Sequence, residues 1–189
     1  MKESCSEVDS AFWLFSQSIY AAAGVQEECL QLQDKFGVDI NLLLFSAFIG
    51  AVHGALLPIE ELRNAGAAVA QWQGNVVRSL RTIRRALKQA DLPHPAVALP
   101  VDSLRKTVKS VELEAERIEQ IALEAWCQSR VGSWPRAERN AAVTANIRAL
   151  LALSGMVPQE IALPANTIAA VQMAARQAMI ESKNDEPRS

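Results

Sequence analysis

The hydrophobic positions along this chain recur at helical spacing, and no stretch shows the strict alternation of a half-buried strand. The pattern therefore predicts an all-α fold of about seven helices, arranged as a helical bundle. The expected helices span approximately residues 9–23, 25–36, 39–53, 58–90, 102–131, 136–154 and 165–181.

The expected boundaries rest on residues that favour helix ends. Gly24 and Gly37 suit the left-handed position after a helix, and Asp39 is a good N-cap. Pro58 is favoured in the first turn of the next helix. The helix over 39–53 is apolar almost all round, which predicts that it is buried on most sides.

Residues 58–131 predict a long antiparallel helical hairpin that turns at the proline-rich segment 92–100. Each arm has about 30 residues and a length of roughly 45 Å at about 1.5 Å per residue. We expect one domain over 1–181 and a disordered tail over 182–189. Near-heptad apolar positions suggest where the two arms meet. On the first arm these are Ile59, Leu62, Gly66, Val69, Val76, Leu80, Ile83 and Leu87, and on the second Leu104, Val108, Val111, Ala115, Ile118, Ala122 and Ala125.

Composition narrows the function classes. Apolar residues make up 50% of the 189 residues, and the net charge of −2 gives no general attraction to nucleic acid or anionic membrane. The longest apolar run, about 42–57, is short for a membrane span, and no apolar segment follows the initial Met as in a signal peptide. These features predict a cytoplasmic protein without a membrane span.

A short polar group lies among the large apolar residues of the first 50 positions. It consists of Gln33, Asp34, Asp39 and Asn41, and the turn at Gly37 brings its members together. In the structural interpretation these side chains cap and lock the helix ends. In the functional one they form a carboxylate and amide pocket for a polar ligand or a hard metal ion. No Glu-x-x-His pair accompanies them, so we assign no metal and no cofactor.

His53 is the one histidine within an expected helix, and it stands between Gly50 and Gly54. It is interpreted as a core or helix-end histidine, with proton transfer near the polar group as the alternative. No nucleophile elbow, phosphate-binding loop, dinucleotide fingerprint or zinc spacing is present. This pattern favours a protein that is not an enzyme, and no catalytic residue is assigned.

Basic residues gather toward the turn of the expected hairpin. They are Arg78, Arg81, Arg84, Arg85, Lys88, Arg105, Lys106 and Lys109. They either grip phosphate, RNA or an acidic partner, or pair with glutamates on the second arm. No aromatic platform accompanies them, so a nucleic-acid partner is not expected.

The block from Phe12 to Gly50 resembles a proteobacterial family of hypothetical proteins, described as a domain of unknown function. The resemblance rests on Phe12-Trp13, Phe15-Ser16, Tyr20, Gly24-Val25, Cys29-Leu30, Leu32-Gln33-Asp34, Gly37, Asp39, Asn41-Leu42-Leu43-Leu44 and Gly50. It implies a small bacterial cytosolic helical protein and carries over no activity.

Three functions follow as hypotheses. The first is a non-enzymatic protein-binding or adaptor module, whose hairpin binds a protein partner or a second copy of the chain. The second is a small-ligand or metal binder, or an enzyme, that uses the polar group. The third is RNA or phosphate binding at the basic end of the hairpin.

Overall fold

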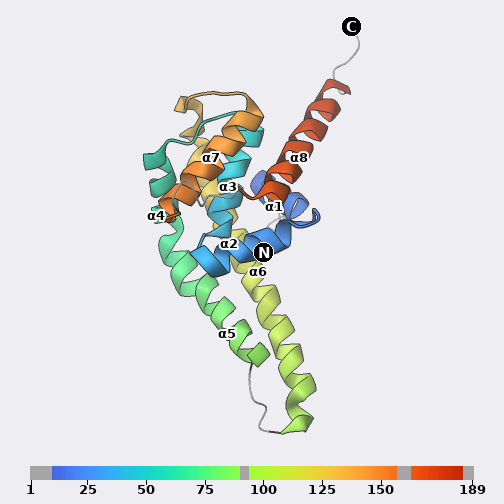
Figure 1. Cartoon of the computed structure of the whole chain (residues 1–189). Helices are drawn as coiled ribbons and strands as arrows, with labels where there is room; N and C mark the ends of the chain where they lie inside the picture. The colour runs from blue at the N-terminus through green and yellow to red at the C-terminus, as the bar shows by residue number, and fades with distance from the viewer. Residues whose placement is uncertain (1–9, 90–93, 157–162, 185–189) are drawn as a thin grey trace, which may run out of the picture.

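A computed structural model of the chain describes residues 10–89, 94–156 and 163–184, and these are helical with no β-strand (Figure 1). The predicted all-α class is confirmed. The helices are α1 (Ala11–Tyr20), α2 (Val25–Phe36), α3 (Ile40–His53), α4 (Ile59–Trp72), α5 (Arg78–Gln89), α6 (Ala98–Gln128), α7 (Arg139–Leu153) and α8 (Ala165–Asn184). Short 3₁₀ turns over Pro95–Val97 and Val131–Ser133 flank α6.

Helices α4 and α5 are one continuous rod, joined by a π-helical segment, η1 (Gln73–Val77). Counting that rod once, the described residues form seven helical rods, as the sequence pattern predicted. The π turn is wider than an α turn, so it rotates everything after it about the helix axis. As a result Val77, which is 1% exposed, occupies the inward-facing position that the near-heptad spacing predicted for Val76.

Helix α3 is the centre of the bundle and packs against α1, α2, α4, α6, α7 and α8 (Figure 1). Its apolar surface explains this position, because every residue from Leu43 to Ala51 is buried. The rings of Phe12, Phe45 and Phe48 form an aromatic cluster, with centroids 5.6 Å apart for Phe12–Phe45 and 5.1 Å for Phe12–Phe48. Ser10 caps α1, and Asp39 caps α3 as predicted.

Gly50 sets the distance between α3 and α7. A Cβ atom at Gly50 would lie 2.5 Å from the backbone nitrogen of Val143 and 2.7 Å from its Cα. Those atoms are backbone and have little freedom to move. The close crossing of α3 and α7, the most extensive helix pair in the fold, therefore requires glycine at this position.

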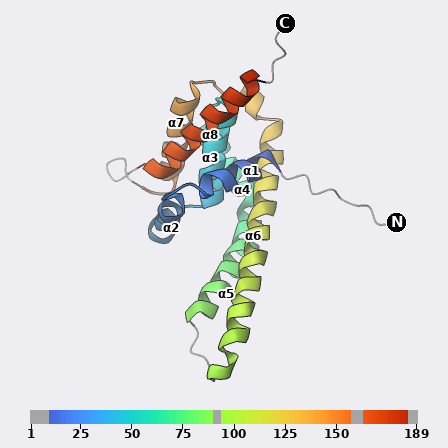
Figure 2. The ribbon, with the colours of Figure 1, turned by 90° about the vertical axis from the view of Figure 1, so that its right-hand side faces the viewer.

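The hairpin of α4–η1–α5 and α6 packs on the bundle at its base and projects from it at its far end, as the two views in Figures 1 and 2 agree. Its second arm contains 31 residues, which fits the predicted length. The projecting part exposes its side chains widely, and no residue of α5 is buried.

The predicted apolar face of α6 is wrong, because most of it points to solvent. Leu104 is 52% exposed, Val111 49% and Ile118 42%. The side of α6 that packs inward carries instead Glu112, Ala115, Glu119, Gln120, Leu123 and Cys127. Apolar content alone does not determine this face, because arginines from α5 pair with Glu112 on it and with the neighbouring Glu116, which allows these carboxylates to lie there.

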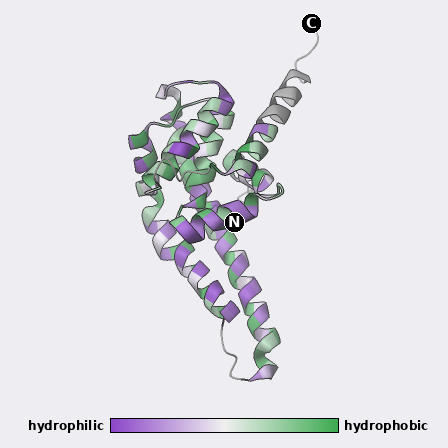
Figure 3. Ribbon diagram, viewed as in Figure 1, coloured by the Kyte–Doolittle hydropathy of each residue, from purple (hydrophilic) through white to green (hydrophobic). Residues whose placement is uncertain are grey.

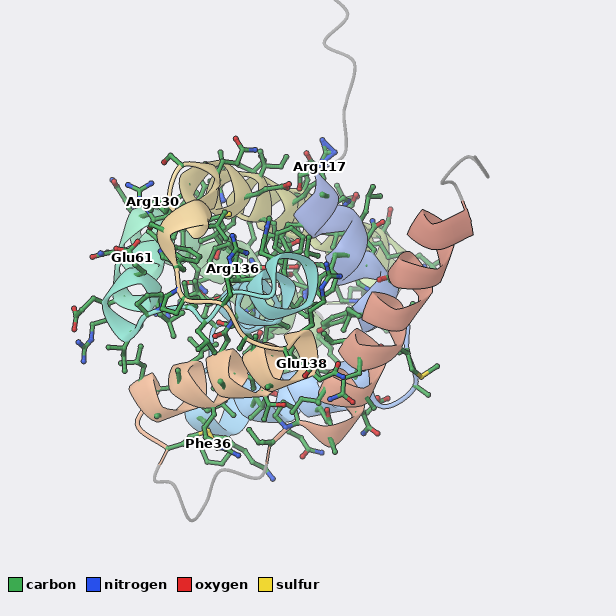
Figure 4. The ribbon with its side chains drawn as sticks, turned by 90° about the horizontal axis from the view of Figure 1, so that it is seen from above. Phe36, Glu61, Arg117, Arg130, Arg136 and Glu138 are labelled. Carbon is green, nitrogen blue, oxygen red and sulfur yellow. The ribbon has the colours of Figure 1, made fainter. Side chains whose placement is uncertain are left out.

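The two ends of the bundle are closed by polar contacts. Beyond the last turn of α3, the Arg136 guanidinium donates to the carbonyl oxygen of His53 (Figure 4). The Glu28 carboxylate accepts from the backbone nitrogens of Asn166 and Thr167, both at 2.9 Å, and so caps α8. Helix α8 continues to Asn184, into the predicted tail; residues 185–189 lie outside the described residues.

None of the helices in the described part of the chain has the length and apolar character needed to cross a membrane.

Candidate functional site

A pocket of about 650 Å³ opens where α1, α2 and the start of α3 meet η1 and α6. Its volume lies in the range of small-molecule sites. Residues from all of these elements line it: Trp13, Ser16, Gln17, Tyr20, Ala21, Gln26, Leu30, Gln33, Asp39, Ile40, Asn41, Leu44, Gln73, Val77, Arg81, Arg84, Lys109, Glu112, Leu113, Glu116 and Gln120. Amide, carboxylate and guanidinium groups therefore share the wall with aromatic and aliphatic side chains.

The start of α3 supplies two polar groups to the wall. The Asp39 carboxylate accepts from the backbone nitrogens of Asn41 at 3.0 Å and Leu42 at 3.3 Å. Burial raises the pKa of Asp39, although these two hydrogen bonds and the charges of Arg81 and Arg78 oppose that rise. The Asn41 side-chain oxygen accepts from Gln120 Nε2 at 2.8 Å, which ties the start of α3 to α6.

A charged network joins α5 to α6 along one side of the pocket. Arg81 donates to Glu112 at 3.1 Å and to Glu116 at 2.7 Å, and Arg84 also donates to Glu112. Burial alone would raise the pKa of Glu112, but the hydrogen bonds from Arg84 and Arg81 hold it below its ordinary value. Burial is the stronger effect at Glu116, whose pKa is raised. The two arginines are thus already engaged by carboxylates of the protein itself.

Glu119 lies one helical turn beyond Glu116 and is 1% exposed. Neither of its carboxyl oxygens has a hydrogen-bond partner among the described residues. Burial, reinforced by the negative charge of Asp39, raises the pKa of Glu119 to about 8, while Asn41 and Arg81 act in the opposite direction. The pKa of this carboxyl therefore lies above that of an ordinary glutamate, and burial is the main cause.

Glu119 does not itself line the pocket, but two buried groups that do line it are unpartnered among the described residues. Ser16 and Gln120 are each 3% exposed and both line the pocket. Ser16 Oγ and Gln120 Oε1 have no hydrogen-bond partner within the part of the chain that the structure describes. Folded proteins satisfy the large majority of buried polar atoms, so a group of such atoms at one pocket needs an explanation.

Of the residues proposed from the sequence, Gln33, Asp39 and Asn41 line this pocket, and two others lie elsewhere. Asp34 is 53% exposed at its side chain and pairs with Arg85 of α5 at 2.5 Å. His53 lies at the opposite end of α3, with its ring against Phe48. Burial and the nearby Arg136 lower the pKa of His53.

The basic residues of the hairpin are largely taken up by carboxylates. Arg81 and Arg84 pair with α6, Arg85 pairs with Asp34, and Arg105 and Lys106 both pair with Asp102. Salt bridges to the described residues are absent for Arg78, Lys88 and Lys109. Most of the predicted basic patch is therefore matched within the hairpin.

Among the described residues, no group of three histidine, cysteine, aspartate or glutamate side chains is placed to hold a metal ion. Ser16 and Gln120 line the pocket but were missed in the sequence interpretation. Ser16 lies between apolar residues, as the polar group near Gly37 does, so the same pattern in α1 indicates it. Gln120 lies among many charged positions of α6, and no such pattern marks it.

The fold and pocket define an all-α protein with a polar, small-molecule-sized cavity beside its central helix. The chain belongs to the family described as a protein of unknown function, DUF2390, which it matches over residues 11–123. That match contains α1 to α5 and most of α6, including every residue that lines the pocket. No curated protein and no solved structure shows significant similarity to the chain.

Proposed function

We propose that this protein binds a small polar ligand in the pocket between α1, the start of α3, η1 and α6. The observation that carries the proposal is a pair of buried oxygens in the wall of one cavity, Ser16 Oγ and Gln120 Oε1, that have no partner among the described residues. An unsatisfied buried polar group costs about 1–3 kcal/mol, and a ligand that hydrogen-bonds to both would recover that free energy.

The π-helical segment η1 supports the same site independently. Such segments are rare and are frequently found at functional sites. Two of its five residues, Gln73 and Val77, face the pocket. The extra width of this turn brings Val77 inward and aligns Arg81, one turn later, with Glu112 and Glu116.

A fragment screen followed by NMR tests this proposal. The indole of Trp13 lines the pocket and reports occupancy, whereas Trp134 lies outside the wall and serves as an internal reference. Leu30→Trp places a large ring in the wall, and Leu14→Trp, at a similarly exposed position on α1 that does not line the pocket, is its matched control.

We expect polar fragments to shift the Trp13 resonance in the wild type and in Leu14→Trp, and not in Leu30→Trp. A screen in which no fragment acts on Trp13, with the two buried groups hydrogen-bonded only to water, would contradict the proposal.

A second candidate function, protein binding through the hairpin, is favoured by the exposed apolar line on α6. Leu104, Val111 and Ile118 lie seven residues apart and are 42–52% exposed. Apolar and polar residues are interspersed along the projecting part of α6 in Figure 3. Positions with a seven-residue period suit pairing with another helix.

The partner we propose for this face is a second copy of the chain in antiparallel orientation. Residues 98–109 of α6 carry the basic residues Arg105, Lys106 and Lys109 together with Asp102, and the remainder is predominantly acidic. Antiparallel pairing sets these opposite charges against each other, whereas parallel pairing sets like against like.

Sedimentation of the full chain tests this pairing. We expect a dimer for the wild type and for Ile83→Glu, which alters an exposed residue of α5, and a monomer for Val111→Glu. A monomeric wild type would refute the second candidate and leave the pocket proposal standing. The bacterial, cytoplasmic setting inferred from the sequence, and the absence of catalysis, stay predictions, as does phosphate binding by the hairpin.

A further inference from the structure

We propose that the far end of the helical hairpin docks on the surface of a membrane that contains anionic phospholipids. The first turns of α6 form this end, and they lie well away from the bundle in both views of the ribbon (Figures 1 and 2). The proposal does not depend on the pocket, which opens where the hairpin meets α1, α2 and α3.

An exposed apolar segment covers this end of the hairpin. Residues 95–101 contain only proline, alanine, valine and leucine. Five of them are exposed, and the other two, Val97 and Val101, are half-buried. Leu99 is 84% exposed, the highest value for a large hydrophobic side chain among the described residues. Single exposed apolar residues are ordinary, but seven in succession at the end of a projecting element indicate a surface that contacts another apolar medium.

Positive charge surrounds the apolar segment. Residues 85–109 carry five basic and two acidic side chains, a net charge of +3, whereas the rest of the chain carries 14 basic and 19 acidic ones, a net charge of −5. Asp102 pairs with both Arg105 and Lys106, so these three groups together keep one positive charge. Lys88 and Lys109 have no salt bridge to the described residues. The end of the hairpin therefore attracts anionic surfaces although the whole chain is slightly acidic.

The apolar and basic groups lie at different depths along the hairpin. Leu99 precedes Lys106 by seven residues of α6, which corresponds to about 10 Å along the helix axis. When Leu99 enters the boundary between headgroups and acyl chains, Lys106 therefore lies at the level of the phosphates. The same spacing places both side chains on one side of α6, whereas Leu104 is about 140° around the helix from Leu99. Pairing of two chains through Leu104 and Val111 thus leaves the Leu99 side free.

A membrane fits this end of the hairpin better than RNA or an acidic protein does. Residues 85–109 include no phenylalanine, tyrosine or tryptophan on which bases could stack. An acidic protein would account for the basic side chains but not for an apolar segment at the outermost position. A phospholipid surface accounts for both, because its phosphates lie outside an apolar interior.

Sedimentation of the full-length protein with lipid vesicles tests the proposal. The vesicles contain either phosphatidylcholine alone or phosphatidylcholine with about one third phosphatidylglycerol, which supplies the anionic charge. Leu99→Asn removes the apolar side chain at the tip, and Met173→Asn is its control because Met173 is a 63% exposed residue of α8. Lys106→Gln removes one charge at the tip, and Lys35→Gln, in the last turn of α2, is its control.

We expect the wild type and both controls to sediment with the anionic vesicles and not with the neutral ones. The affinity should fall about fivefold in Lys106→Gln and about tenfold or more in Leu99→Asn, and it should weaken as the salt concentration rises. Equal binding to neutral vesicles, an unchanged affinity in Leu99→Asn, or no binding of the wild type would each overturn the proposal. So would binding of single-stranded oligouridine in place of vesicles, which would assign the basic residues to RNA.

Discussion

Replacing Glu119 by glutamine should stabilise the ligand-free protein increasingly as the pH rises. The folded pKa of Glu119 is about 8, against an ordinary value of 4.5. Between these values the folded state holds a proton that the unfolded state has lost, so this group lowers the free energy of unfolding as the pH increases. The loss is about 1.4 kcal/mol per pH unit. Glutamine has nearly the same size and does not titrate.

The expected difference between Glu119→Gln and the wild type is close to zero below about pH 4, where the folded and unfolded carboxyls are both largely neutral. It should reach about 3 kcal/mol at pH 7 and about 5 kcal/mol above pH 8. Urea unfolding at pH 5, 6, 7 and 8 measures it, with Glu114→Gln as the exposed control that should show no such trend. A stability difference that stays constant over this pH range would refute the reasoning, because it would show that Glu119 titrates normally in the folded state.

Three other substitutions test the packing and the polar network by chemical unfolding. Arg81→Met should cost about 3 kcal/mol at pH 7 because it leaves buried glutamates unmatched, and the loss should shrink as they become neutral at lower pH; a loss independent of pH would contradict this. Asn146→Leu should cost about 3 kcal/mol, since this 1% exposed amide satisfies three buried backbone groups, and a neutral effect would contradict that role. Gly50→Ala should cost about 1–3 kcal/mol through its clash with α7, whereas Gly74→Ala, with nothing within 4 Å of the added carbon, should not destabilise; equal effects would refute the packing argument.

The sequence pattern predicted most of the fold because the strongest signals are local. Helix α2 lies at its predicted bounds, since Gly24 and Gly37 both adopt positive φ at its ends. Helix α3 is buried as its all-round apolar surface required, and Asp39 caps it. The hairpin also follows from local information, because a proline-rich turn separates two long helical patterns.

The face of α6 could not be predicted in the same way, because contacts distant in sequence determine it. Glu112 is buried by virtue of Arg81 and Arg84, which lie 31 and 28 residues earlier. The π turn also changes which side of α5 points inward, and five ordinary residues over 73–77 carry no obvious mark of it. Apolar residues at heptad spacing therefore indicated the exposed apolar side of α6 rather than the side that packs inward.

The candidate site was predicted in part for the same reasons. Asp39 and Asn41 stand out as polar residues within an apolar run, and both line the pocket. Gln120 is recognisable as a site residue only when α6 packs against the start of α3, because its partner Asn41 lies 79 residues away along the chain. His53 stood out in the sequence, but fourteen residues of helix place it at the other end of α3.

The pocket's role as a binding site is tested most directly by native mass spectrometry of the full chain, purified without dialysis and compared with its denatured mass. We predict a non-covalent mass excess in the wild type and in Leu14→Trp that is lost in Leu30→Trp, with the excess identifying the ligand by its mass. The same bare mass for all three proteins, or an excess that Leu30→Trp retains, would contradict ligand binding in this pocket.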